Sequence, residues 1–174
     1  PSAEQAKVLK TKDYNIFSVL QIQSKEVLIC RMIADLLNPR GQHGAGAEYL
    51  KIFLRDCLGM EKMDTKLADQ AIVTAEYAID DERRIDIVIE IGSYFLPIEV
   101  KIYAADQKSQ CFDYYQYAKR RDAQAKVYYL TLDGHRPGKD STSSGSQSVP
   151  EEDIVCLSFR VHILNWLKAC KSCE

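Results

Sequence analysis

The stretch Arg84-IDIVIEIGSYFLPIEV-Lys101 decides the fold, because two apolar runs rich in β-branched residues flank the dipeptide Gly92-Ser93. A two-residue turn at this dipeptide predicts an antiparallel hairpin. The register that follows from the turn brings Asp86 opposite Glu99. Directly opposed Cβ atoms lie roughly 4.5 to 5.5 Å apart. The hairpin therefore predicts two neighbouring carboxylates.

The two faces of this hairpin are expected to differ, because side chains alternate along a strand. The turn pairs Ile91 with Tyr94, and the same register puts Lys101 on the face of Glu99. The opposite face is predicted to be a hydrophobic core formed by Ile85, Ile87, Ile89, Ile98, Val100 and Ile102.

The acidic face predicts a divalent-metal site beside a lysine. Two facing carboxylates repel, which raises one pKa unless a cation lies between them or one carboxyl group stays protonated. Oxygen ligands suit Mg²⁺ or Mn²⁺. The Lys101 ammonium could orient or help to deprotonate an attacking water and stabilise the charge that develops at a phosphate. An exposed cross-strand salt bridge is the alternative interpretation, and spacing alone favours neither.

Three segments resemble the PD-(D/E)XK nuclease superfamily. Ile85-Asp86 with Glu99-Val100-Lys101 matches its central motif, with Ile85 in place of the usual proline. Downstream, Asp106-QKSQCFDYYQY-Ala118 has the Q-x-x-x-Y spacing of the RecB-type branch. Upstream, Ser24-KEVLICRMIADLLNPRGQHGAGAEYLKIFL-Arg55 is similar to the leader of a bacterial family in this superfamily, which carries an LL-x-P-x-G-x-HG turn between two helices.

This resemblance implies a metal-dependent nuclease with a restriction-endonuclease-like α/β fold, a mixed sheet flanked by helices in the order ααβββαββα. By the resemblance, the metal ligands are Asp86, Glu99, the Val100 carbonyl and, as a secondary ligand from the first helix, Glu26. The alternative for Glu26 is a carboxylate that the helix dipole favours in the first turn without any metal. Lys101 positions the attacking water. Gln110 is expected to hydrogen-bond Lys101 or the scissile phosphate, and the cofactor is expected to be Mg²⁺ or Mn²⁺.

Nucleic acid, with DNA favoured, is the expected partner. Arg84, Lys108 and Tyr114 are the predicted contacts. The basic residues expected around the proposed site are Arg83, Arg84, Lys101, Lys108, Lys119, Arg120 and Arg121. The net charge of −2 argues against a strongly basic nucleic-acid binder, although a metal cleft can attract phosphate to an acidic protein. Nucleases of this kind often pair two copies to cut both strands. Two alternatives stay open: an inactive module of the same fold that binds nucleic acid or protein, and a small-molecule phosphodiesterase.

The 174 residues are expected to form one domain. Helices are predicted from near Ser24 to before Pro39, after Gly46, over 106–121 and around Val161, Leu164, Trp166 and Leu167; strands are predicted over 71–79, 84–91, 95–102, 127–132 and 154–158. Residues 134–150, rich in Gly, Ser and Pro, are predicted to be a mobile loop within that domain. No apolar run or signal pattern suggests a membrane, so a soluble, cytoplasmic protein is expected.

Structural roles are expected for the other residues that could bind metal, react or stack on bases. The six cysteines are expected to be reduced thiols, and Cys170 with Cys173 forms a lone C-x-x-C that does not favour zinc. His43 is expected to be structural or solvated, since no second histidine lies nearby in the sequence. Six tyrosines could stack on unpaired bases, although most should pack a helix against the sheet: Tyr103, Tyr114, Tyr115, Tyr117, Tyr128 and Tyr129.

Overall fold

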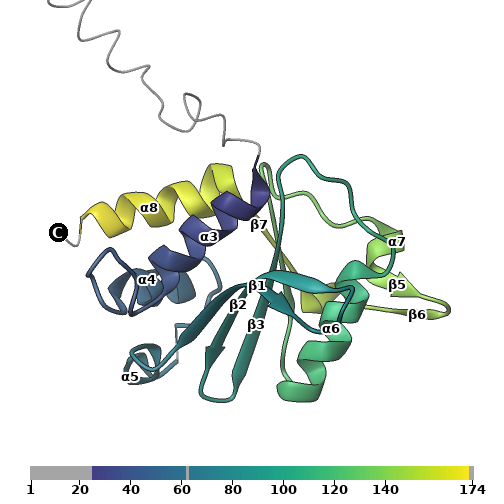
Figure 1. Cartoon of the computed structure of the whole chain (residues 1–174), viewed down its shortest axis with the longest axis horizontal. Helices are drawn as coiled ribbons and strands as arrows, with labels where there is room; N and C mark the ends of the chain where they lie inside the picture. Colours follow the sequence, from purple (N-terminus) through teal and green to yellow (C-terminus); the bar gives the residue numbers. More distant parts are fainter. Residues whose placement is uncertain (1–24, 62, 173–174) are drawn as a thin grey trace, which may run out of the picture.

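The computed structural model describes residues 25–61 and 63–172 and contains a five-stranded mixed sheet between helices (Figure 1). The sheet order is β1-β2-β3-β4-β7. Its strands are β1 (Ile72–Ala78), β2 (Arg84–Ile91), β3 (Tyr94–Lys101), β4 (Val127–Thr131) and β7 (Ile154–Ser158). The predicted strands are all present, and the predicted α/β fold with a mixed sheet is confirmed.

Antiparallel and parallel pairing meet at β3, which pairs antiparallel with β2 and parallel with β4. The predicted turn forms, with Gly92 at a positive φ of 57° that a glycine adopts without steric cost. Ile91 faces Tyr94 and Ile87 faces Ile98, so the predicted register is confirmed over this part of the hairpin. Because β3, β4 and β7 run parallel, their carboxyl ends lie at the same end of the sheet.

Helices cover both faces of the sheet (Figure 1). On one side lie α3 (Glu26–Leu37), α4 (Glu48–Asp56) and α8 (Leu164–Lys171), and on the other lies α6 (Gln110–Arg121). Shorter elements are α5 (Thr65–Ala68), α7 (Lys139–Thr142), β5 (Ser143–Ser144), β6 (Gln147–Ser148), a 3₁₀ turn over Glu151–Asp153 and a π-helical turn over Phe159–Ile163. Among the described residues, no helix has the length and apolar character needed to cross a membrane.

Both faces of the hairpin are buried, which corrects the prediction of one core face. Ile87, Ile89 and Ile98 pack with α3, α4 and α8, whereas Val88 and Phe95 pack with α6. Ile85, predicted to face the first group, belongs to the second. Its neighbour Asp86 lies opposite Glu76, where the β1–β2 pairing is interrupted and Glu76 has a φ of 54°. The regular alternation of side chains is lost at this irregularity.

The segment 134–150 contains more regular structure than its composition predicts. It folds into α7 and the β5–β6 hairpin, which attach to the start of α6. The Ser109 amide donates to the Asp140 carbonyl oxygen, and the Cys111 amide donates to the Ser141 hydroxyl oxygen. Val149 is buried against Phe112. Mobility of this segment stays a prediction.

The closing helix buries fewer of its predicted apolar residues than expected. Trp166 is buried, but Val161, Leu164 and Leu167 are exposed. Ile163, the last residue of the π-helical turn, and Cys170 are buried instead, at ordinary helical spacing from Trp166. The Trp166 indole donates a hydrogen bond to the Tyr49 carbonyl oxygen at 2.8 Å and packs edge-on against Phe53.

We predict that Trp166→Ala lowers the free energy of unfolding by about 3 to 5 kcal/mol, because it leaves a cavity and removes the hydrogen bond to the Tyr49 carbonyl oxygen. The matched control is Leu167→Ala, the next residue on the same helix, whose side chain is 38% exposed. Its expected loss is below about 1 kcal/mol. Urea unfolding measures both, and equal losses would contradict the assignment of Trp166 as the core anchor.

Candidate active site

Asp86, Glu99 and Lys101 come together at the end of β3, as the hairpin register predicts. The Lys101 Nζ atom lies 2.7 Å from Glu99 Oε1. Asp86 Oδ2 accepts a hydrogen bond from the Val100 amide at 2.8 Å, so it reaches across to the backbone between the other two residues. Glu99 is 1% exposed and Lys101 is 8% exposed. Such burial argues against the alternative of an exposed cross-strand salt bridge.

Burial makes the carboxylates of this site difficult to ionise together. Burial and the charge of Asp86 raise the pKa of Glu99 to about 8, with Lys101 opposing the shift. Burial also raises the pKa of Asp86, against the Val100 amide and Lys101. For Lys101, burial lowers the pKa, but the nearby carboxylates outweigh it and the net pKa is raised. Lys101 is therefore a cation that donates hydrogen bonds.

The donor set fits a hard divalent cation. Glu99 Oε2 is buried and has no hydrogen-bond partner, and among the described residues it is the one buried side-chain polar atom in that condition. Unpaired buried oxygens are costly, and a cation would satisfy this one. Over the same residues, no group of three or more His, Cys, Asp and Glu side chains is placed to hold a metal. The site thus offers two carboxylates, which suit Mg²⁺ with retained waters, and the Val100 carbonyl stays a predicted ligand.

Glu26 holds the backbone that follows the site. Its Oε1 atom accepts hydrogen bonds from three successive amides, those of Ile102 at 2.7 Å, Tyr103 at 2.8 Å and Ala104 at 3.0 Å. Burial raises the pKa of Glu26, but these amides and Lys101 outweigh it, and the pKa lies below its usual value. The predicted role of Glu26 as a metal ligand stays a prediction. Sequence periodicity did not indicate this backbone clamp, because backbone donors leave no sequence signal.

Gln110 and Tyr114 form a structural chain in place of the predicted contacts. The Gln110 Nε2 donates to the Tyr114 hydroxyl at 3.0 Å, and that hydroxyl donates to the Arg84 carbonyl oxygen at 2.5 Å. Gln110 has no hydrogen bond to Lys101 among those of the described residues. Tyr114 is 1% exposed, which argues against the predicted contact with nucleic acid. The Q-x-x-x-Y pair instead fastens α6 to the start of β2, two residues before Asp86.

The predicted basic group is divided between two locations. Arg83 lies at the start of α6, where it bonds Asp113, Gln107 and the Lys108 carbonyl oxygen. Lys119, Arg120 and Arg121 lie at the other end of α6, about 18 Å away for a twelve-residue helix. Lys119 pairs with Asp153 and Arg121 with Glu90. The prediction that these three residues surround the site is therefore wrong, while Arg84 and Lys108 are exposed near it.

His43 has a structural role, as expected. Its Nδ1 accepts from the Ala45 amide, its Nε2 lies 3.0 Å from the Asn38 carbonyl oxygen, and its ring stacks on Tyr49. A Cβ at Gly41 would lie 2.2 Å from the Asp35 carbonyl oxygen, so this turn requires glycine. The described cysteines are not joined by disulfides, and Cys173 of the C-x-x-C pair lies outside the described residues.

The mixed sheet, the flanking helices and the acid–acid–lysine site define a restriction-endonuclease-like protein. A family model described as the PD-(D/E)XK nuclease superfamily matches residues 14–173. The chain belongs to that superfamily, as its motifs predict. Searches of curated proteins and of solved structures found no match. Nuclease or related phosphodiesterase chemistry is general to this family. A small-molecule phosphodiester therefore stays an alternative substrate.

We predict that Glu26→Ala lowers the free energy of unfolding by about 1 to 3 kcal/mol, because three amides lose a charged acceptor. The matched control is Glu48→Ala, also in a first helical turn, whose carboxylate pairs with Lys51 at the surface. Its expected loss is about 0.2 to 1 kcal/mol. Because the folded-state pKa of Glu26 is lowered, its contribution is present above about pH 4.3 and is lost as the pH falls. Urea unfolding at neutral and acid pH tests both statements.

We predict that divalent cations raise the melting temperature of the metal-free protein, because binding to the native state stabilises it. At a concentration 100 times the Kd, the stabilisation is about 2.7 kcal/mol. Glu99→Gln should abolish the shift, and Glu90→Gln, a half-buried strand glutamate that pairs with Arg121, should retain it. Thermal unfolding with Mg²⁺, Mn²⁺ and Ca²⁺ measures this. An equal shift in the Glu99 variant would place the cation elsewhere.

Proposed function

We propose that this protein is a divalent-metal-dependent nuclease that hydrolyses phosphodiester bonds of nucleic acid, with DNA as the favoured substrate. The observation that carries the proposal is the half-buried Asp86 beside the buried Glu99 and Lys101, with Glu99 Oε2 left without a partner. A purely structural ion pair would satisfy its buried oxygens. A site with two neighbouring carboxylates, one of which has an oxygen without a partner, suits a cation and a phosphate.

The proposed roles follow from the contacts of each residue. Asp86, Glu99 and the Val100 carbonyl are the proposed metal ligands, and the amide of Val100 holds Asp86 in place. Mg²⁺ or Mn²⁺, when bound, supplies positive charge that polarises the phosphate and makes a bound water more acidic. Lys101, as a cation, donates hydrogen bonds to the attacking water or to the phosphate oxygens. Its present partner is Glu99 Oε1, which keeps the ammonium at the site.

Residues around the ligands position them. Tyr114 fixes the backbone at Arg84, and Glu26 fixes the backbone after Lys101. The two ends of the ligand-bearing segments are therefore held by side chains from α6 and α3. Arg84 and Lys108, both exposed, are the proposed contacts to the nucleic-acid backbone. A cytoplasmic location and a pairing of two copies stay predictions.

The deciding experiment is cleavage of supercoiled DNA, linear duplex, single-stranded DNA and RNA with Mg²⁺ or Mn²⁺. Asp86→Asn and Glu99→Gln should abolish cleavage, and Lys101→Ala should lower the rate by at least about 100-fold, because transition-state charge loses its donor. The matched control is Lys168→Ala, which removes an exposed lysine from α8, and this variant should retain activity.

Each other outcome points to a different function. Full turnover by a variant of Asp86, Glu99 or Lys101 removes that residue from the mechanism. Nucleic-acid binding without cleavage, unchanged by metal or by these substitutions, supports the inactive binding module. Hydrolysis of a small phosphodiester such as bis(4-nitrophenyl) phosphate without cleavage of any nucleic acid supports the small-molecule enzyme.

A further inference from the structure

Tyr103 differs in exposure from the other five tyrosines that the sequence analysis considered for stacking on bases. Tyr114, Tyr128 and Tyr129 are buried, and Tyr115 and Tyr117 pack against core clusters. Tyr103 is 69% exposed, the largest fraction among the exposed large hydrophobic side chains of the described residues. Over the same part of the chain, no aromatic or cationic side chain is recorded against its ring. Its faces are available to a ligand.

The backbone of Tyr103 is fixed next to the proposed site. Tyr103 lies two residues beyond Lys101, and its amide donates to Glu26 Oε1 together with the amides on either side. A little further along, Asp106 accepts from the Tyr129 hydroxyl and from the Gly138 amide, each at 2.7 Å. Both sides of the residue are therefore anchored to the fold. The exposed ring projects from an ordered backbone and loses little freedom on binding.

The charge of the protein makes an uncharged binding contribution useful. A net charge of −2 limits the affinity available from counterion release, the main source of non-specific binding to nucleic acid. Stacking of a base on an aromatic ring depends little on sequence, because every base has a π face. Only an unpaired base exposes that face to a protein side chain, since the bases of an intact duplex stack on one another.

We propose that Tyr103 stacks on an unpaired nucleobase next to the scissile phosphate and gives the protein a preference for single-stranded or frayed substrates. This inference rests on the proposed nuclease function, since the ring is placed by its distance along the chain from Lys101. Glu26 supports the stacking by holding the Tyr103 amide. Tyr103 thus selects the substrate, while Asp86, Glu99 and Lys101 act on the phosphate.

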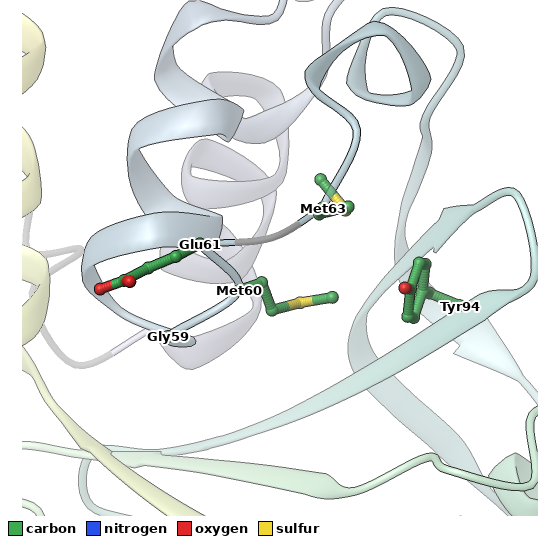
Figure 2. Close-up of a pocket in the computed structure, with 5 residues that line it drawn as sticks. All are labelled: Gly59, Met60, Glu61, Met63 and Tyr94. Atoms are coloured by element: carbon green, nitrogen blue, oxygen red, sulfur yellow. The ribbon is translucent and has the colours of Figure 1, made fainter.

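The matched control lies at the start of β3, the strand whose end precedes Tyr103. Tyr94 begins β3, is 37% exposed, and lines a pocket of about 310 Å³ with Gly59, Met60, Glu61 and Met63. In Figure 2, Tyr94 and Met60 lie across this pocket from one another. Tyr94→Ala removes the same kind of side chain at the end of β3 that is remote from the proposed site. It should leave binding and cleavage of nucleic acid unchanged.

The test compares wild type, Tyr103→Ala, Tyr103→Phe, Tyr103→Trp and Tyr94→Ala. Two measurements are made with fluorescein-labelled oligonucleotides, one single-stranded and one fully paired: fluorescence anisotropy with Ca²⁺, and kcat/KM with Mg²⁺ or Mn²⁺. Tyr103→Ala should weaken binding to the single strand by about 5- to 100-fold, the range for loss of one stacked base. The loss on the duplex should be smaller, and the Phe and Trp variants should bind like wild type.

Salt dependence separates stacking from a charge contact. Tyr103→Ala should weaken binding by the same factor at each salt concentration, whereas Lys108→Ala, which removes a proposed phosphate contact, should make the salt dependence shallower by about 0.7 in the logarithmic slope. Equal losses on single strand and duplex would overturn the stacking proposal, because they would indicate a general effect on the site. Unchanged binding in Tyr103→Ala would overturn it too.

The failures of this inference and of the proposed function are distinguishable. Cleavage that needs Lys101 but ignores Tyr103 overturns only the stacking role. Tyr103-dependent binding without cleavage by the wild type overturns the nuclease and leaves the stacking role standing. If neither binding nor cleavage occurs, and Tyr103→Ala instead changes the mass measured by size-exclusion chromatography with light scattering, Tyr103 belongs to an interface between copies and both proposals fall.

Discussion

The pairing of β2 with β3 is the constraint on which the site depends. Gly92 permits a two-residue turn, and the register that follows carries Asp86 to the neighbourhood of Glu99 and Val100. A shift by one residue would exchange the two faces of both strands. Because each face packs against its own helices, such a shift would place the apolar side chains of each face against the wrong layer. Core packing and the placement of the acidic residues therefore select the same register.

Burial of the acidic site has an electrostatic cost that Lys101 reduces but does not remove. The carboxylate of Glu99 keeps one oxygen without a partner although Lys101 contacts the other. Replacing a buried ion pair by apolar residues is often neutral or stabilising, so burial of this charge is not explained by stability alone. The proposed binding of a cation and a phosphate would explain it more directly, because a low-dielectric surrounding strengthens both interactions.

Sequence reasoning predicted the features that depend on short-range pattern. The hairpin, the strands and the first two helices followed from alternation and helical periodicity, and the acid pair followed from the turn. Long-range contacts were beyond these patterns. The interrupted pairing at Glu76 altered which residues are buried, and neither it nor the π-helical turn before α8 has a distinctive local composition. Tyr114 was predicted as a nucleic-acid contact because its spacing with Gln110 is visible in the sequence, whereas its bond to the Arg84 carbonyl is not.

The structure joins stability and proposed chemistry through α3 and α6. Glu26 in the first turn of α3 holds the backbone after Lys101, and Tyr114 on α6 holds the backbone before Asp86. These helices pack on opposite faces of the sheet, so the site lies where both layers meet its edge. Displacement of either helix would move one of the ligand-bearing segments relative to the other. The geometry of the site is thus as rigid as the packing of the two layers. Tyr103 shares that rigidity, because its amide is held by the Glu26 carboxylate.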